Sequence, residues 1–209
     1  MTWFRIERVT WAERALWLGL VLGSVAPLAL RPAPEAVMRA YVEAVNRGDP
    51  DAALGLTGTD FVLRPSLGGQ YRRRDEVRGV LEYRAALHER WGVVDWEYDP
   101  VDREVHALVE VTNDAWEVLR IRPQVEVVLV VRNTRLILEQ PRADSRELIR
   151  ALEPFLAWAA AERPRELARV WYGGQPVRRK DAARRLVALL AAWRAETAPV
   201  AERAPEEQA

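Results

Sequence analysis

A run of strand-like alternation in the middle of the chain limits the fold more than any other feature. In residues 104–112 (EVHALVEVT), Val105, Ala107, Val109 and Val111 recur at every second position, so a strand here has one apolar face. Similar strand patterns occupy residues 94–98, 124–131 and 136–139. Because short turns connect these segments, consecutive strands are predicted to pair antiparallel.

Helical patterns stand on both sides of these strands. Before them, apolar side chains recur at helical spacing in residues 34–46 and 76–91, and a short strand is predicted at 61–63. After them, further helices are predicted at residues 145–161, 164–170 and 180–195. Helices followed by an antiparallel sheet and then by more helices predict an α+β fold, in which a helical layer covers one curved face of the sheet.

The two ends of the chain differ from its middle. We divide it into an apolar segment and linker (1–33), a folded domain (34–195) and a disordered tail (196–209) rich in proline and acidic residues. Residues 15–30 contain no charged side chain and would span about 24 Å as a helix, slightly less than the roughly 30 Å of a hydrocarbon layer.

This apolar segment has three interpretations. We favour an uncleaved signal anchor, in which the apolar segment extends back to residue 11 and attaches the chain to a membrane. The alternatives are a cleaved signal peptide, for which the cleavage pattern is poor, and a helix that packs on the domain or on a partner. Without the anchor, the chain is predicted to be cytoplasmic. Partition of the full chain between membrane and soluble fractions would distinguish the anchor from the packed helix.

Composition excludes several classes of function. The 209 residues include no cysteine and only two histidines, which excludes disulfides, cysteine nucleophiles, thiolate zinc sites and a histidine-rich metal site. Thirty-one basic and 31 acidic residues cancel, so no charge excess points to a nucleic acid. We therefore expect no metal and no cofactor, and any chemistry is expected to use carboxylates, amides and phenols.

Five segments together resemble a known superfamily. They are AYVEAVNRGDPDAALGL (40–56), GGQYRRRDEVRGVL (68–81), VEVTNDAW (109–116), the paired strands of 124–139 and PFLAWAAAERPRELARV (154–170). In this order they resemble the nuclear transport factor 2-like or SnoaL-like superfamily, and in particular its bacterial polyketide-cyclase-like domains. The resemblance implies a cone-shaped curved antiparallel sheet wrapped by N-terminal helices, with a pocket at the open end. Residues from Ser145 onward add a C-terminal helical extension.

The polar end of the strand at 104–112 contains the best candidate for chemistry. Asp114 is predicted as a general base, Asn113 as a positioning donor and Trp116 as an apolar wall. Tyr41, on the apolar face of the first helix, is a further candidate donor. The alternative for Asn113-Asp114 is a turn that ends the strand, because both residue types favour such turns.

Other residues are candidates for the wall of a pocket. Trp91, Trp96, Trp116 and Trp158 supply aromatic side chains, although aromatic residues commonly only build the core. Glu126 and Gln140 would face the lumen in one strand register and the outside in the other. The epoxide-hydrolase version of the resembled fold uses two aspartates bridged by an arginine, and no positions of this sequence are matched to that set.

Members of the resembled superfamily include both enzymes and binding domains, so the resemblance does not define the function. The sequence favours a domain that binds a small hydrophobic molecule or serves as an accessory interaction module. The first alternative is a metal-free acid–base isomerase, cyclase or dehydratase acting on a small hydrophobic substrate. The second is a homodimerisation module without a ligand, in which the open sheet face is the interface.

Overall fold

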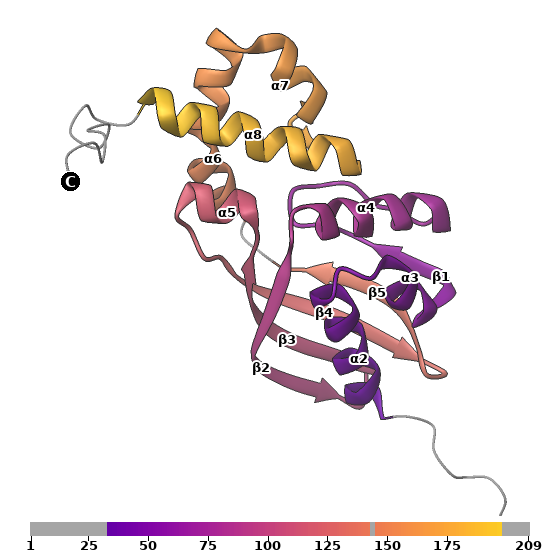
Figure 1. Cartoon of the computed structure of the whole chain (residues 1–209). Helices are drawn as coiled ribbons and strands as arrows, with labels where there is room; N and C mark the ends of the chain where they lie inside the picture. The colour runs from indigo at the N-terminus through magenta and orange to yellow at the C-terminus, as the bar shows by residue number, and fades with distance from the viewer. Residues whose placement is uncertain (1–32, 143–144, 198–209) are drawn as a thin grey trace, which may run out of the picture.

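The computed structural model describes residues 33–142 and 145–197. Its main sheet has five strands in the order β1-β5-β4-β3-β2 and lies below the C-terminal helices in the view of Figure 1. The strands are β1 (Thr57–Leu63), β2 (Arg90–Asp99), β3 (Glu104–Thr112), β4 (Gln124–Arg132) and β5 (Arg135–Pro141). Strands β2 to β5 pair antiparallel in sequence order, whereas β1 pairs parallel with β5. Helices cover the sheet, so the α+β fold class is confirmed.

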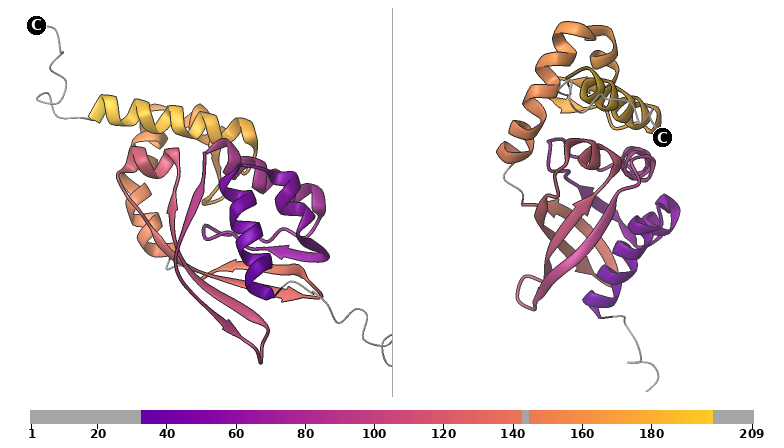
Figure 2. Two further views of the ribbon diagram at one scale, coloured as in Figure 1. Left: turned by 60° about the horizontal axis from the view of Figure 1, so that its bottom comes forward. Right: turned by 60° about the vertical axis from the view of Figure 1, so that its left-hand side comes forward.

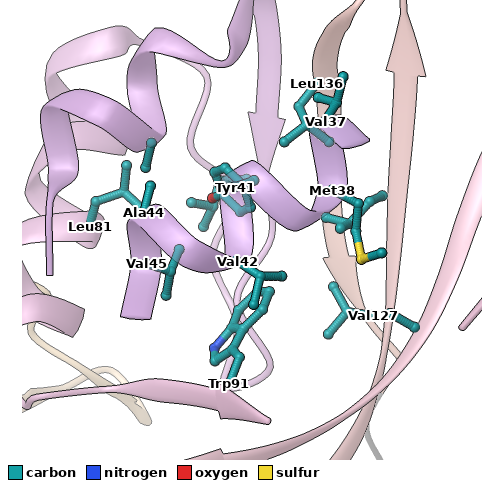
Figure 3. Close-up of a cluster of buried hydrophobic side chains, with 14 of the residues drawn as sticks. Val37, Met38, Tyr41, Val42, Ala44, Val45, Leu81, Trp91, Val127 and Leu136 are labelled. Carbon is teal, nitrogen blue, oxygen red and sulfur yellow. The ribbon is translucent and has the colours of Figure 1, made fainter. Parts of the chain in front are cut away.

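The first two helices cover one face of the sheet. Helix α2 (Pro34–Asn46) begins with a proline, which suits a first helical position because its missing N–H needs no partner there. Helix α3 (Pro50–Gly55) is capped by Asp49, whose carboxylate accepts from the backbone N–H of Ala52 at 2.9 Å. In Figure 3 the side chains of α2 point toward Trp91 on β2 and Val127 on β4, which places the first hydrophobic core between α2 and the sheet.

The long helix ends earlier than its apolar pattern predicts. Helix α4 runs over Arg74–Ala86, and His88 then adopts a left-handed conformation with φ of 52°, which stops the helix. Trp91, predicted on the helix, therefore lies on β2. The side chain of Asn46 holds this strand, because it accepts from the backbone N–H of Trp91 at 2.7 Å and donates to its carbonyl at 3.0 Å. This tertiary contact thus holds Trp91 in a strand, although its position in the sequence continues a helical pattern.

The start of α4 also differs from the prediction by two residues. Arg73 is the N-cap residue, and the carboxylate of Glu76 accepts from the backbone N–H of Arg73 at 3.3 Å. Asp75 lies in the first helical turn, where its negative charge suits the N-terminal end of the helix dipole.

The C-terminal residues form a second layer at one end of the sheet. It consists of α6 (Ser145–Glu162), α7 (Pro164–Val170) and α8 (Lys180–Thr197), with the two-residue strands β6 (Trp171–Tyr172) and β7 (Gln175–Pro176). Gly173 and Gly174 both have positive φ, as the tight turn between β6 and β7 requires. Figures 1 and 2 show this layer stacked over α4 and the short helix α5 (Asp114–Leu119). Side chains of α4, α5, α6 and α8 form a second hydrophobic core there.

Several predictions fall on parts of the chain outside the described residues. The apolar segment at 15–30 and nearly all of the tail lie there, so the signal anchor and the three-part division of the chain stay predictions. Among residues 33–142 and 145–197, no helix is both long and apolar enough to cross a membrane.

Candidate functional site

A cavity of about 120 Å³ lies between the inner face of the sheet and the C-terminal layer. Its wall is mainly apolar and includes side chains from α4, β3, β4, α6 and α8. Polar and charged side chains interrupt this wall at a few positions: Ser66, Tyr83, Arg84, Glu89, Asn113, Glu139 and Arg178. The cavity therefore combines an apolar interior with a small number of polar groups, which is the usual composition of a small-molecule site.

Arg84 bridges two carboxylates at the wall of this cavity. Its Nη2 atom lies 2.7 Å from Oε1 of Glu139 and its Nη1 atom 3.2 Å from Oε2, so the pair is bidentate. Its Nε atom lies 3.4 Å from Oε1 of Glu89. Tyr41 donates to Oε2 of Glu139 at 2.5 Å, and the indole N–H of Trp91 donates to Oε1 of Glu89 at 2.9 Å. A buried acid, a shared cation and a second acid thus form one connected network.

An irregularity in β5 turns Glu139 toward the interior. Leu136 pairs with Val131 and Leu138 pairs with Val130, so β5 contains one residue more than β4 across this interval. Such a bulge reverses which side chains face inward beyond it. Leu136 and Glu139 both have an exposed fraction of 0%, although strict alternation would place them on opposite faces.

The environment shifts the pKa values of three groups at the site. Burial raises the pKa of Tyr41 well above its ordinary value, and the adjacent charge of Glu139 adds to this shift. Burial also raises the pKa of Tyr83, although the positive charge of Arg178 opposes the shift. Burial by itself lowers the pKa of Arg84, but the charges of Glu139 and Glu89 outweigh it, so the net pKa is raised. Arg84 therefore stays charged and both phenols stay protonated.

The raised phenol pKa values predict how stability changes at alkaline pH. In the unfolded chain a tyrosine loses its proton near pH 10. Because the folded pKa values of Tyr41 and Tyr83 are higher, their contribution to stability is complete below about pH 10 and is lost as the pH rises toward the folded values. In a titration of phenolate absorbance, we expect two of the five tyrosines to ionise only with unfolding.

The variant Tyr83→Phe is expected to remove one of these two late-ionising groups. Circular dichroism in the same titration identifies the pH at which the chain unfolds. Ionisation of all five tyrosines near pH 10 while the native spectrum persists would contradict the prediction.

The structure brings three of the predicted site residues to the cavity. Asn113, Trp116 and Trp91 all line it. Asn113 also fits the alternative interpretation, a turn that ends the strand. Its Oδ1 atom accepts from the backbone N–H of Trp116 at 2.9 Å and caps α5. Tyr41 is fully buried and contacts Glu139, but it is not among the described residues of the cavity wall.

Asp114, predicted as a base, lies outside the cavity wall. It occupies the first turn of α5, and its carboxylate lies 2.8 Å from Nδ1 of His88, whose side chain is largely exposed. The physical reason is that the chain turns into a helix directly after Asn113. This turn directs consecutive side chains to different sides.

The remaining predicted pocket residues also lie elsewhere within the described part of the chain. Glu126 belongs to the outer face of β4, where it contacts Nδ1 of His106 at 3.0 Å. Trp96, on β2, packs beside the first core and below the guanidinium of Arg39. Trp158 packs against Phe155 in the second core, with a ring separation of 6.5 Å. Each of these tryptophans contributes to a core, as aromatic residues commonly do.

Sequence reasoning missed the bridging set itself. Arg84 falls on the same helical stripe as Val77 and Val80, so a charged residue at a core position was a usable signal. Glu139 had no such signal, because the bulge in β5 inverts the facing that alternation predicts. Within the described ranges, no three His, Asp or Glu side chains form a group suited to a metal ion.

Comparisons with known proteins identify similar solved structures. No protein-family model matches this chain, and no curated protein matches its sequence. An NTF2-like protein of unknown function from Cytophaga hutchinsonii is 10% identical, with 57% of this chain and 97% of that chain covered and a TM-score of 0.47. A putative polyketide cyclase from Xanthomonas campestris is 20% identical, with 57% and 96% covered and a TM-score of 0.48.

A protein with a ketosteroid isomerase-like fold from Catenulispora acidiphila, in complex with trimethylamine, is also similar. It is 14% identical, with 51% of this chain and 84% of that chain covered and a TM-score of 0.42.

Proposed function

We propose that this chain binds a small, mainly apolar molecule in the cavity between the sheet and the C-terminal layer. The observation that carries the proposal is an apolar cavity with a few polar groups in its wall, two of them the buried Arg84 and Glu139. Burying charge away from water costs free energy unless it is fully paired. A side-chain cluster of this kind at a cavity wall is therefore typical of a functional site.

The size of the cavity limits the ligand. An engineered apolar cavity of about 150 Å³ binds benzene. The cavity here has about 120 Å³, so the ligand is expected to have roughly the size of one aromatic ring. Apolar side chains from both hydrophobic cores surround it, which favours a hydrophobic body with a small polar end.

Filling the cavity is expected to abolish binding. Ala115 is buried and lines the cavity, so Ala115→Leu would occupy part of its volume. A ring-sized probe such as benzaldehyde that binds only the folded chain at 100 times its Kd raises the free energy of unfolding by about 2.7 kcal/mol. We expect this gain in the parent chain and its loss in Ala115→Leu, measured by thermal unfolding with and without the probe.

The matched control is Ala188→Leu, which adds the same volume at an exposed position of α8 outside the cavity wall. This variant should keep the full gain from the probe. An equal gain in both variants would contradict binding in the cavity. Native mass spectrometry of the purified chain provides a second test, because a ligand that co-purifies with the parent should be missing from Ala115→Leu.

A metal-free acid–base enzyme is the second candidate, and the two carboxylates that Arg84 bridges favour it. Glu139 has both oxygens occupied by Arg84 and Tyr41. Glu89 uses only Oε1 in its contacts with described residues, so Oε2 is available as a base beside the cavity. In this candidate function, Glu89 accepts a proton from the substrate, and Arg84 and Glu139 hold the side chain of Glu89 in position.

Exchange of substrate protons with deuterated water tests the second candidate. A small apolar ketone such as acetophenone should lose its α-protons faster with the parent chain than with Glu89→Gln. Glu97→Gln, on β2 and with a carboxylate outside the cavity wall, serves as the control. Equal exchange in the parent and in Glu89→Gln would reject Glu89 as the base.

A further inference from the structure

Three residues of the cavity wall, Tyr83, Asn113 and Arg178, have side-chain N–H or O–H groups that donate to no described residue. Tyr83 and Asn113 are buried, with exposed fractions of 8% and 4%, and Arg178 is half-buried. All three line the cavity. In the described part of the chain, every side-chain nitrogen or oxygen that is completely shielded from solvent has a partner. The free donor atoms of these residues therefore reach accessible space, and the cavity is the space that all three residues line.

The phenol of Tyr83 is one of the two buried donors. Tyr83 lies on α4 one turn before Leu87, whose carbonyl accepts from the backbone N–H of Asp114 at 3.0 Å. This contact holds Asn113 beside the same end of α4. The Oδ1 atom of Asn113 caps α5, so its Nδ2 group is directed elsewhere and donates to no described residue. Two uncharged donors from different elements thus line one part of the wall.

Arg178 adds a positive charge from the C-terminal layer. Its Nη1 atom donates to the hydroxyl of Tyr71 at 3.0 Å and contacts Oε1 of Gln175 at 3.5 Å. Its Nε and Nη2 groups donate to no described residue, and the described part of the chain places no carboxylate within 4.0 Å of the guanidinium. Arg178 and Tyr83 line the same cavity, and the positive charge of Arg178 opposes the rise in the pKa of the Tyr83 phenol that burial causes.

The acceptors of the cavity contrast with these donors. Glu139 accepts from Arg84 and Tyr41, and Glu89 is paired with Arg84. Apart from Oε2 of Glu89, the free groups named here are donors, and one of them carries a full positive charge. We propose that the small apolar molecule held in the cavity carries a carboxylate, which Tyr83, Asn113 and Arg178 bind. This inference rests on the proposed binding function and defines the chemical class of its ligand.

Charge at the cavity wall is compatible with an anionic ligand. The two negative groups, Glu89 and Glu139, share the cation of Arg84, which partly cancels their repulsion of an anion. Arg178 has no such acid partner in the described ranges, and a guanidinium presents its N–H groups in a planar fork that matches a carboxylate. A neutral ligand would leave this charge at the wall without a counter-charge.

Size-matched probes test the charge of the ligand directly. Benzoate and benzamide have nearly the same shape, and only benzoate is charged at neutral pH. By isothermal titration calorimetry with the full chain, we expect benzoate to bind at least tenfold more tightly than benzamide. Arg178→Gln should weaken benzoate binding about tenfold and benzamide binding much less. Tyr83→Phe should weaken benzoate binding to a smaller extent, because it removes one uncharged hydrogen bond.

The control is Arg179→Gln, which removes the same charge from the adjacent exposed residue that pairs with Asp181 at 3.6 Å. It should leave benzoate binding unchanged. If benzoate and benzamide bind equally in the cavity, or if Arg178→Gln and Arg179→Gln weaken benzoate binding equally, the carboxylate inference is wrong while the binding function holds. If neither probe binds, and Ala115→Leu changes nothing, both the inference and the proposed function fail. Circular dichroism of each variant confirms that it is folded.

Discussion

Replacing Arg84 by methionine is expected to lower the free energy of unfolding by about 3–5 kcal/mol. Glu139 has an exposed fraction of 0%, and Arg84 supplies two of its three hydrogen bonds. The variant leaves the buried carboxylate with Tyr41 as its only donor among the described residues, and it also removes the cation from Glu89. A loss of this size is a large part of the stability of an ordinary domain. Urea unfolding followed by circular dichroism measures it.

Arg78→Met is the matched control, because it makes the same change on the same helix. The side chain of Arg78 is 43% exposed and pairs with Asp51 at 2.6 Å, so solvent screens the pair and its loss should have little effect. The double variant Arg84→Met with Glu139→Leu should recover part of the stability, since it removes both buried charges together. A small loss in Arg84→Met, comparable to that in Arg78→Met, would contradict the buried bridge.

Replacing Phe155 by alanine is expected to cost about 3–5 kcal/mol of unfolding free energy. Phe155 is fully buried in the second core, where its ring lies 6.0 Å from that of Trp193 and 6.5 Å from that of Trp158. Removing the ring leaves a cavity between α6 and α8 that these neighbours fill only in part. The whole chain should unfold at lower temperature, because α4 contributes side chains to both hydrophobic cores.

Ile149→Ala is the control for this prediction. Ile149 lies on the same helix but is 47% exposed, so its truncation should change stability by no more than about 0.5 kcal/mol. Differential scanning calorimetry shows whether the second core unfolds with the sheet. Two separate transitions, with only one of them shifted by Phe155→Ala, would show that the C-terminal layer is an independent unit.

Much of the element order follows from local patterns. The strand at 104–112 and the helix at 164–170 have the predicted bounds, because a period of two and a proline at a first helical position are local signals. Trp91 shows the limit of such signals. Its spacing continues the helical pattern, yet Asn46 from α2 binds its backbone and holds it in β2. The homodimer and the membrane anchor remain predictions.

The candidate site depends on sequence and tertiary structure in different ways. Asn113, Trp116 and Trp91 were predicted pocket or site residues, and all three line the cavity. Arg178 lies far from these three residues in the sequence. It reaches the same cavity only because the C-terminal layer folds back over α4 and α5. A contact between segments so far apart in the chain leaves no local pattern.

The sequence by itself determined the α+β class and most of the order of the elements, because apolar periodicity depends on neighbouring residues alone. Only the tertiary structure decided which polar side chains meet. A bulge in β5 turns Glu139 inward, and the packing of α4 brings Arg84 between this acid and Glu89. Local sequence patterns define the helices and strands. The site depends on strand register and packing, which arise from interactions between distant parts of the chain.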